Sequence, residues 1–328
     1  MAATNVFKVS DLIAKYGWQI LPYLSNLGVN VLSEGAVLFV DGNHTNTLDA
    51  DDGEHGHSFE KPYATLNYAV YMATANAGDV ILVAPNHAET IEDGGSASSA
   101  TTDELVLDKA GITIIGIGND ATRPTFTFET ATDASMVITA ANITVKNLIL
   151  AGNLEDLATL VDAAGTADGL TFDNCEFRDG GTDELETIHQ IDLATGCHRV
   201  TINNCRFFTT SGGSSTLANI EVATGVNNLT ITNCWFRGDV NTDGMIDGSG
   251  GAGSNWYIKD NILDNLDAAT GKCIVLNAAT TGVVMGNIAH AAVDATSPFT
   301  VAGVVVAQNY YSNAEGASAA ILDPATDS

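Results

Sequence analysis

The chain has 328 residues, with 40 Asp and Glu against 12 Lys and Arg, which gives a formal net charge of −28 at pH 7. Hydrophobic residues make up 45% of it, and this excludes a disordered acidic segment, which would be poor in apolar residues. Twelve cations cannot supply the basic surface that a nucleic acid or an anionic membrane requires. We therefore expect neither a nucleic-acid partner nor a membrane partner.

Residues 1–36 precede the first strand pattern and form a separate segment. Its apolar residues have helical spacing: Val9, Leu12, Ile13, Tyr16 and Ile20. This spacing predicts a short helix that caps an open end of the fold or anchors it to another subunit. The segment lacks the continuous apolar region of a secretory signal, so we expect synthesis and assembly in a cytoplasm.

An eight-residue repeat recurs through the second half of the chain at intervals of 21 to 30 residues. Its copies are ITVKNLIL (143–150), LTFDNCEF (170–177), VTINNCRF (200–207), LTITNCWF (229–236), WYIKDNIL (256–263), VVMGNIAH (283–290) and VVVAQNYY (304–311). Repeats of this length indicate a solenoid, and the alternation of apolar and polar residues within each copy indicates a strand. We predict an all-β protein with a single right-handed parallel β-helix of about eight coils over residues 37–312, a short N-terminal helical cap and a C-terminal tail at 313–328.

The aligned copies predict which side chains stack from coil to coil. Two inward columns are expected, one of Leu170, Val200, Leu229, Trp256 and Val283, the other of Phe172, Ile202, Ile231, Ile258 and Met285. A column at the strand ends, expected to form an amide ladder, contains Asn147, Asn174, Asn204, Asn233, Asp260, Asn287 and Gln308. The next column, of Cys175, Cys205 and Cys234, is expected to be packed inside the coil.

Residues 37–91 carry a motif of known type. It consists of Val40-Asp41-Gly42-Asn43, Asp52-Gly53, Pro62-Tyr63, Thr65-Leu66, Ala69-Val70, Gly78-Asp79, Pro85 and Glu89. The motif resembles the entry segment of pectate-lyase-like right-handed β-helix proteins, although NHAE (86–89) departs from the usual Gly and aromatic residue. The resemblance implies a short helix from Thr65 to about Ala75 that caps the first coil. It specifies the fold and not the chemistry.

The resemblance includes enzymes that act on polysaccharides, and a glycosidase with this fold would need two carboxylates on outward positions of neighbouring coils. The columns Asp173–Asn203–Thr232 and Glu176–Arg206–Trp235 place no two acids on adjacent coils. A loop at 179–189 contains Asp183, Glu184, Glu186 and His189, and consecutive coils carry Arg178, Arg206, Arg237 and Lys259. These cations are suited either to a lyase base or to ordinary surface ion pairs. We predict no catalytic site.

The best metal candidate is the loop DVNTDGMID (239–247). Asp239, Asn241, Asp243 and Asp247 are hard oxygen ligands within one short turn, as Ca²⁺ prefers. The bidentate acid of an EF-hand is missing, since Gly250 stands at its position. The alternative is an acidic Asx-turn without a metal.

The coils also resemble decoration, fibre and spike proteins of tailed bacteriophages. This resemblance implies a non-catalytic structural virion protein, made in the host cytoplasm, forming a homotrimer and contacting other virion proteins. One alternative is a tailspike-type depolymerase of a host polysaccharide, with Trp235, Tyr257 and Phe208 stacking on sugars. The other is a non-catalytic carbohydrate-binding adhesin.

Overall fold

A computed structural model describes residues 35–95, 97–99, 104–181, 185–209, 216–241, 243–267, 271–292 and 297–312, and the backbone of 320–322. The N-terminal cap predicted for residues 1–36 lies almost entirely outside these ranges. No helix in the described ranges is long and apolar enough to cross a membrane.

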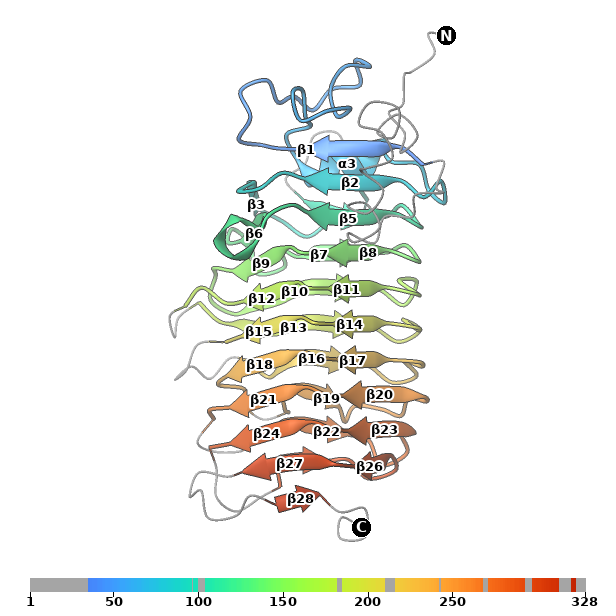
Figure 1. The fold of residues 1–328 in the computed structure, drawn as a ribbon, viewed down its shortest axis with the longest axis vertical. Coiled ribbons are helices and arrows are strands. Elements are labelled where there is room, and N and C mark those ends of the chain that lie inside the picture. Colours follow the sequence, from blue (N-terminus) through green and yellow to red (C-terminus); the bar gives the residue numbers. More distant parts are fainter. Residues whose placement is uncertain are drawn as a thin grey trace.

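The chain winds as a parallel β-solenoid, and its strands stack into three sheets along one long axis (Figure 1). Sheet 1 consists of β1 (Val37–Val40), β2 (Val80–Val83), β5 (Thr113–Gly116), β8 (Thr144–Lys146), β11 (Thr171–Asp173), β14 (Thr201–Asn203), β17 (Thr230–Thr232), β20 (Trp256–Lys259), β23 (Gly282–Met285) and β26 (Val305–Ala307). Sheet 2 consists of β3 (Ala88–Ile91), β6 (Thr125–Phe128), β9 (Ile149–Gly152), β12 (Glu176–Arg178), β15 (Arg206–Phe208), β18 (Trp235–Gly238), β21 (Ile262–Asn265), β24 (Ile288–Ala291), β27 (Asn309–Ser312) and β28 (Ala320–Leu322). Sheet 3 consists of β4 (Leu105–Leu107), β7 (Met136–Ile138), β10 (Leu157–Ala163), β13 (Thr187–Leu193), β16 (Ala218–Val222), β19 (Ile246–Gly248), β22 (Ile274–Leu276) and β25 (Phe299–Thr300).

From β2 to β25, each coil contributes one strand to sheet 1, then one to sheet 2, then one to sheet 3. Neighbouring strands pair in parallel, except that β28 runs antiparallel to β27. The predicted all-β parallel solenoid is therefore confirmed. The sheets have ten, ten and eight strands, and the predicted count of about eight coils is not confirmed.

The inward columns of sheet 1 form the centre of the core. Their first four members are buried as predicted: Leu170, Val200, Leu229 and Trp256 in one column, and Phe172, Ile202, Ile231 and Ile258 in the other. The predicted inward positions of Val283 and Met285 are wrong, because β23 pairs with β20 one residue out of the expected register. Val284 is the buried partner of Ile258. Gly282 lies opposite Trp256, where a Cβ would come within 2.0 Å of the Trp256 carbonyl oxygen, so this coil has no side chain in the Trp256 column.

The Asn column forms the sharp turn between sheets 1 and 2. Its residues have positive φ, for example 57° at Asn174 and 53° at Asn204, a conformation that Asn tolerates better than most residues. Asn174 Nδ2 donates to Asn147 Oδ1 at 2.8 Å, and Asn204 Nδ2 donates to Asn174 Oδ1 at 3.1 Å. The predicted amide ladder is thus present over these three coils.

The assignment of Asn287 to this column is wrong, because Gly286 has the positive φ of that coil. Asn287 instead continues the column that begins with the three buried cysteines, and it is buried together with Asn261 and Asn309. Asn261 Nδ2 donates to Asn287 Oδ1 at 3.0 Å, and Asn287 Nδ2 donates to Asn309 Oδ1 at 2.9 Å. The column therefore changes from apolar to polar while its amides remain hydrogen-bonded.

The entry motif supplies the contacts that tie the first coil together. Helix α3 (Leu66–Met72) begins after Thr65, whose hydroxyl accepts from the Tyr68 amide, and it packs against β1, β2 and β4. His87 Nδ1 accepts from the Gly42 amide at 2.9 Å, and its Nε2 lies 3.0 Å from Glu89 Oε2. Thr65, His87 and Glu89 of the entry motif therefore have a structural role in the first coil.

Candidate functional site

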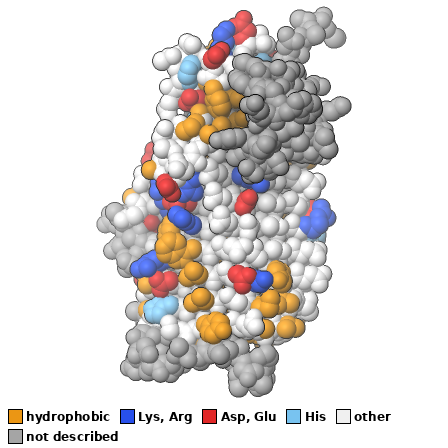
Figure 2. All heavy atoms as spheres, viewed as in Figure 1, with side chains coloured by type: hydrophobic (Ala, Val, Ile, Leu, Met, Phe, Trp, Pro, Cys, Tyr) orange, Lys and Arg blue, Asp and Glu red, His pale blue; other side chains and the backbone are white. Residues whose placement is uncertain are grey.

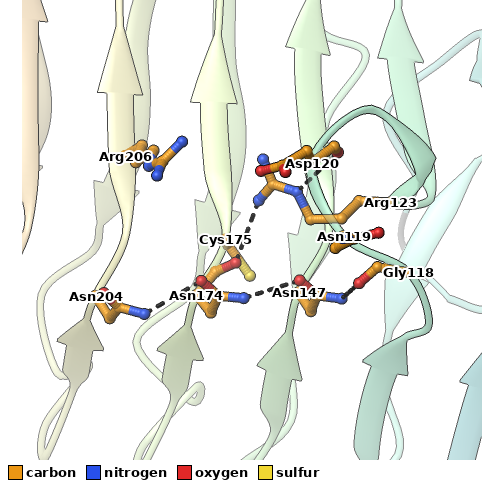
Figure 3. Close-up of a pocket in the computed structure, with 9 residues that line it drawn as sticks. All are labelled: Gly118, Asn119, Asp120, Arg123, Asn147, Asn174, Cys175, Asn204 and Arg206. Carbon is orange, nitrogen blue, oxygen red and sulfur yellow. Dashed lines mark hydrogen bonds between the residues drawn. The ribbon is translucent and has the colours of Figure 1, made fainter.

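A groove beside the Asn ladder has a volume of about 150 Å³ and is lined by Gly118, Asn119, Asp120, Arg123, Asn147, Asn174, Cys175, Asn204 and Arg206 (Figure 3). Most of its polar donors are already used. Asn147 Nδ2 donates to the carbonyl oxygens of Gly116 and Gly118, and Arg123 pairs with Glu176. We therefore interpret the groove as part of the turn structure.

The outer face of sheet 3 carries a column of four acids on consecutive coils. Asp162 pairs in register with Asp192, Asp192 with Glu221, and Glu221 with Asp247. Each acid stands between inward-facing neighbours in its strand, such as the buried Ile220 and Val222 around Glu221, so its side chain projects away from the core. Asp162 is exposed and Asp192 and Glu221 are partly buried, whereas Asp247 is covered and only 3% exposed. Neighbouring strands are about 4.8 Å apart, and this spacing brings the carboxyl groups together. We call these four residues the acid column.

The columns Asp173–Asn203–Thr232 and Glu176–Arg206–Trp235, on sheets 1 and 2, have no two acids on adjacent coils, whereas sheet 3 has four in succession. The repeat marks the Asn turn, and the segments that lead from this turn to sheet 3 differ in length between coils. A sequence signal was nevertheless present. The acid is flanked by short apolar residues in VDA (161–163), IDL (191–193), IEV (220–222) and IDG (246–248).

Burial and mutual repulsion alter the ionisation of this column. Partial burial and the nearby carboxylate of Asp247 raise the pKa of Glu221 to about 8. Burial also raises the pKa of Asp247, although the Ser249 amide and hydroxyl, each 3.0 Å from a carboxylate oxygen, oppose that shift. Glu221 is therefore protonated at neutral pH, and the carboxyl group of Asp247 next to it has hydrogen-bond donors of its own.

His189 and Asp192 belong to β13, which pairs with the strand of Glu221. Burial lowers the pKa of His189, although the charges of Asp192, Asp243 and Asp247 oppose this shift. Burial raises the pKa of Asp192, against the opposing effect of His189. The site thus combines a neutral imidazole with carboxyl groups of unequal acidity, a pattern typical of acid–base chemistry.

The raised pKa of Glu221 predicts a specific dependence of stability on pH. The folded state holds a proton on Glu221 up to about pH 8, whereas the unfolded chain releases it near its usual pKa of 4.5. The stabilising contribution is therefore fully present below about pH 4.5 and is lost as the pH rises through about 8. The Glu221→Gln side chain cannot ionise, so the variant lacks this loss. The melting temperature of the variant minus that of wild type should therefore be larger at about pH 9 than at about pH 5. Thermal melts of both proteins measure the difference, and a difference that is independent of pH would contradict the assignment.

Two of the four predicted metal ligands lie at this site. Asp247 belongs to the acid column, and the charge of Asp243 contributes to the raised pKa values of Glu221 and Asp247. Asp239 and Asn241 are engaged through their backbones: the Asp239 carbonyl accepts from Thr209 and the Asn241 amide donates to the Thr216 carbonyl. Within the described ranges, no three His, Cys, Asp or Glu side chains are arranged to hold a metal ion, and the Ca²⁺ loop stays a prediction.

The predicted sugar-stacking residues lie on other faces. Trp235 and Phe208 are on sheet 2, with ring centroids 5.3 Å apart at an angle of 81°. Tyr257 is on sheet 1. The structure therefore brings two of these three aromatics together, away from the acid column. Asp183 and Glu184 of the 179–189 loop lie outside the described residues.

The five cysteines are free and buried. Burial raises the pKa of Cys197 and of Cys273 to about 12, so these thiols stay protonated and unreactive. The interior positions of Cys175, Cys205 and Cys234 are as predicted.

No protein-family model matches the chain, and no curated protein matches its sequence. Solved structures do resemble the fold. A pectin methylesterase in complex with a hexasaccharide aligns with a TM-score of 0.50 at 12% identity, covering 85% of this chain and 91% of its own. A pectin methylesterase from Aspergillus niger (TM-score 0.49, 13% identity, 89% and 93% covered) and a rhamnogalacturonan lyase (0.45, 12%, 88% and 90%) also align. These are right-handed parallel β-helix proteins, and the match with a TM-score of 0.50 supports the same fold for this chain.

Proposed function

We propose that this protein is a glycoside hydrolase that cleaves a neutral polysaccharide on the outer face of sheet 3. The observation that carries the proposal is the acid column, in which Glu221 has a pKa of about 8 beside the carboxylate of Asp247. A protonated carboxyl next to an ionised one is the pair that glycoside hydrolysis requires. The rigid sheet beneath the column supports both groups at fixed spacing.

Each residue of the pair has a distinct role. Glu221 donates its proton to the glycosidic oxygen as the C–O bond breaks, while the Asp247 carboxylate attacks the anomeric carbon. The resulting glycosyl ester is hydrolysed by water, whose proton returns to Glu221, and Asp247 leaves as a carboxylate. A strand spacing of about 4.8 Å is close to the ~5–5.5 Å separation of retaining enzymes, so the product should retain its anomeric configuration.

The charge of the face selects the class of substrate. Within the described strands of sheet 3 no Lys or Arg accompanies the four acids, so this face offers no cation to a polyanion such as a polyuronate. A neutral glycan needs no such cation and offers hydroxyl donors to Asp162 and Asp192. A chain lying along the solenoid axis would contact successive coils.

The test is hydrolysis of a panel of neutral polysaccharides, measured as new reducing ends. We expect activity in the wild type and a loss on the order of 100-fold or more in Glu221→Gln and in Asp247→Asn. Glu155→Gln is the matched control, because it makes the same chemical change at an exposed position outside the column. Activity that survives in both column variants would exclude the proposed pair.

The role as a structural bacteriophage virion protein is the second candidate. The feature that favours it is the uninterrupted stack of parallel strands, whose turns are joined from coil to coil by side-chain ladders. Such a stack makes a rigid rod. Binding without cleavage in the same panel would favour the predicted adhesin, and neither binding nor cleavage would favour the virion role.

A further inference from the structure

Exposed apolar side chains gather on one part of the surface. In the described ranges eight large hydrophobic residues are exposed, and six of them lie on sheets 1 and 2 between Trp235 and Tyr310. Figure 2 shows hydrophobic side chains over the lower half of this face. Four of the six stand in register on consecutive strands of sheet 2: Trp235, Ile262, Ile288 and Tyr310. We call them the apolar column, and their exposed fractions are 39% to 53%.

Arg206 continues this column by one strand, because it pairs in register with Trp235. Among the Lys and Arg of the described ranges, only Arg206 has a side chain without an ion pair or hydrogen bond. The others pair as Lys61–Glu54, Lys109–Asp108, Arg123–Glu176, Lys146–Asp173, Arg178–Glu176, Arg199–Asp168, Arg237–Asp264 and Lys259–Asp260, and Lys272 donates to the Ser297 carbonyl. An unpaired cation at the end of an apolar row is unusual in a chain with a charge of −28.

Charge determines where two copies of this chain can meet. Most of the molecule is acidic, so two copies repel each other at most orientations. Beside the apolar column, Asp264 is neutralised by Arg237 at 3.2 Å and lies 2.9 Å from His290. This part of sheet 2 therefore has no excess negative charge, in contrast to the acid column on sheet 3.

We propose that two copies associate through the apolar column, antiparallel, about a two-fold axis that passes through Ile262. The order along the five strands is Arg206, Trp235, Ile262, Ile288 and Tyr310, so Ile262 is at the centre. The axis places Ile262 against its own copy and Trp235 against the partner's Ile288. It also places Arg206 over the ring of the partner's Tyr310, a cation–π pair. A surface that is complementary to itself in this way is the requirement for an isologous dimer.

A glycan fits this surface less well than a second copy does. Two side chains of the column, Ile262 and Ile288, are aliphatic and offer no hydrogen bond to sugar hydroxyls. A partner surface of the same composition buries them instead, at about 25 cal/mol for each Å² of apolar area removed from water.

The experiment is sedimentation velocity on the whole chain at concentrations up to about 100 µM. We expect a species of twice the 34.0 kDa chain mass, and an increase of at least about 10-fold in its dissociation constant in Ile262→Asp and in Arg206→Glu. Leu48→Asp is the matched control, because Leu48 and Ile262 are both 49% exposed and Leu48 lies outside the column. Circular dichroism of each variant verifies that the fold is retained.

A wild-type monomer at the highest concentration would overturn the proposal, as would a dimer that Ile262→Asp leaves intact. A trimer would overturn the two-fold geometry. An equal weakening by Leu48→Asp would show a general effect of added charge and would also overturn it.

Discussion

Replacing Arg123 with methionine is expected to lower the free energy of unfolding by about 3–5 kcal/mol. The side chains of Arg123 and Glu176 are 8% and 11% exposed, and Arg123 Nη2 lies 2.5 Å from Glu176 Oε2. Arg123 also donates to the Asn174 carbonyl in the turn. The substitution leaves the Glu176 carboxylate largely buried with only Arg178 beside it, at 3.4 Å. Denaturant titration followed by circular dichroism measures the loss.

The chain offers a close control for this prediction. Arg178 pairs with the same Glu176, but its side chain is 44% exposed, and an exposed pair contributes about 0–1 kcal/mol. Arg178→Met should therefore cost less than about 1 kcal/mol. Adding Glu176→Gln to Arg123→Met should restore part of the stability, because it removes the unpaired charge. Equal losses in the two arginine variants would mean that burial is not the source of the effect.

Phe207→Ala is expected to cost about 3–5 kcal/mol, because it opens a cavity in the middle of a stacked column. The Phe207 ring is parallel to its neighbours, with centroids 4.8 Å from Phe177 and 4.4 Å from Phe236. All three rings are fully buried. The alanine variant therefore removes two ring contacts together with the buried area, and the same denaturant titration records the change.

The neighbouring Phe208 provides the comparison. It is the next residue on β15 but is only partly buried, with its ring edge-on to Trp235. Phe208→Ala should cost about 1 kcal/mol or less. If Phe208→Ala cost as much as Phe207→Ala, the alternation of inward and outward side chains on this strand would be wrong.

The predicted columns succeeded where the aligned Asn or Asp of each copy stands at the turn. From Leu170 to Trp256 the repeat keeps its register, and the alternation of apolar residues matched the observed burial. At Val283 the coil is shortened by one residue, and a shift of one residue exchanges the two faces of a strand. The same shift moved Asn287 from the turn into the core. The identity of Gly286 was a usable signal, because glycine readily adopts positive φ.

The candidate site was missed for a different reason. Asp162, Asp192, Glu221 and Asp247 are separated by 26 to 30 residues, but their offsets from the Asn turn vary. An alignment on the turn therefore does not superimpose them. Only strand pairing shows that they share one column, and only their burial shows that Glu221 retains its proton at neutral pH.

The sequence by itself determined the solenoid, because periodic apolar residues must stack inward whatever the lengths of the intervening loops. It also determined the amide ladder over Asn147, Asn174 and Asn204, since Asn recurs where the backbone must turn. The tertiary structure alone decided which acids meet and which cation of the described ranges stays unpaired. Both depend on distances between residues of different coils, and those distances are fixed by the register of strand pairing rather than by the local pattern of residues.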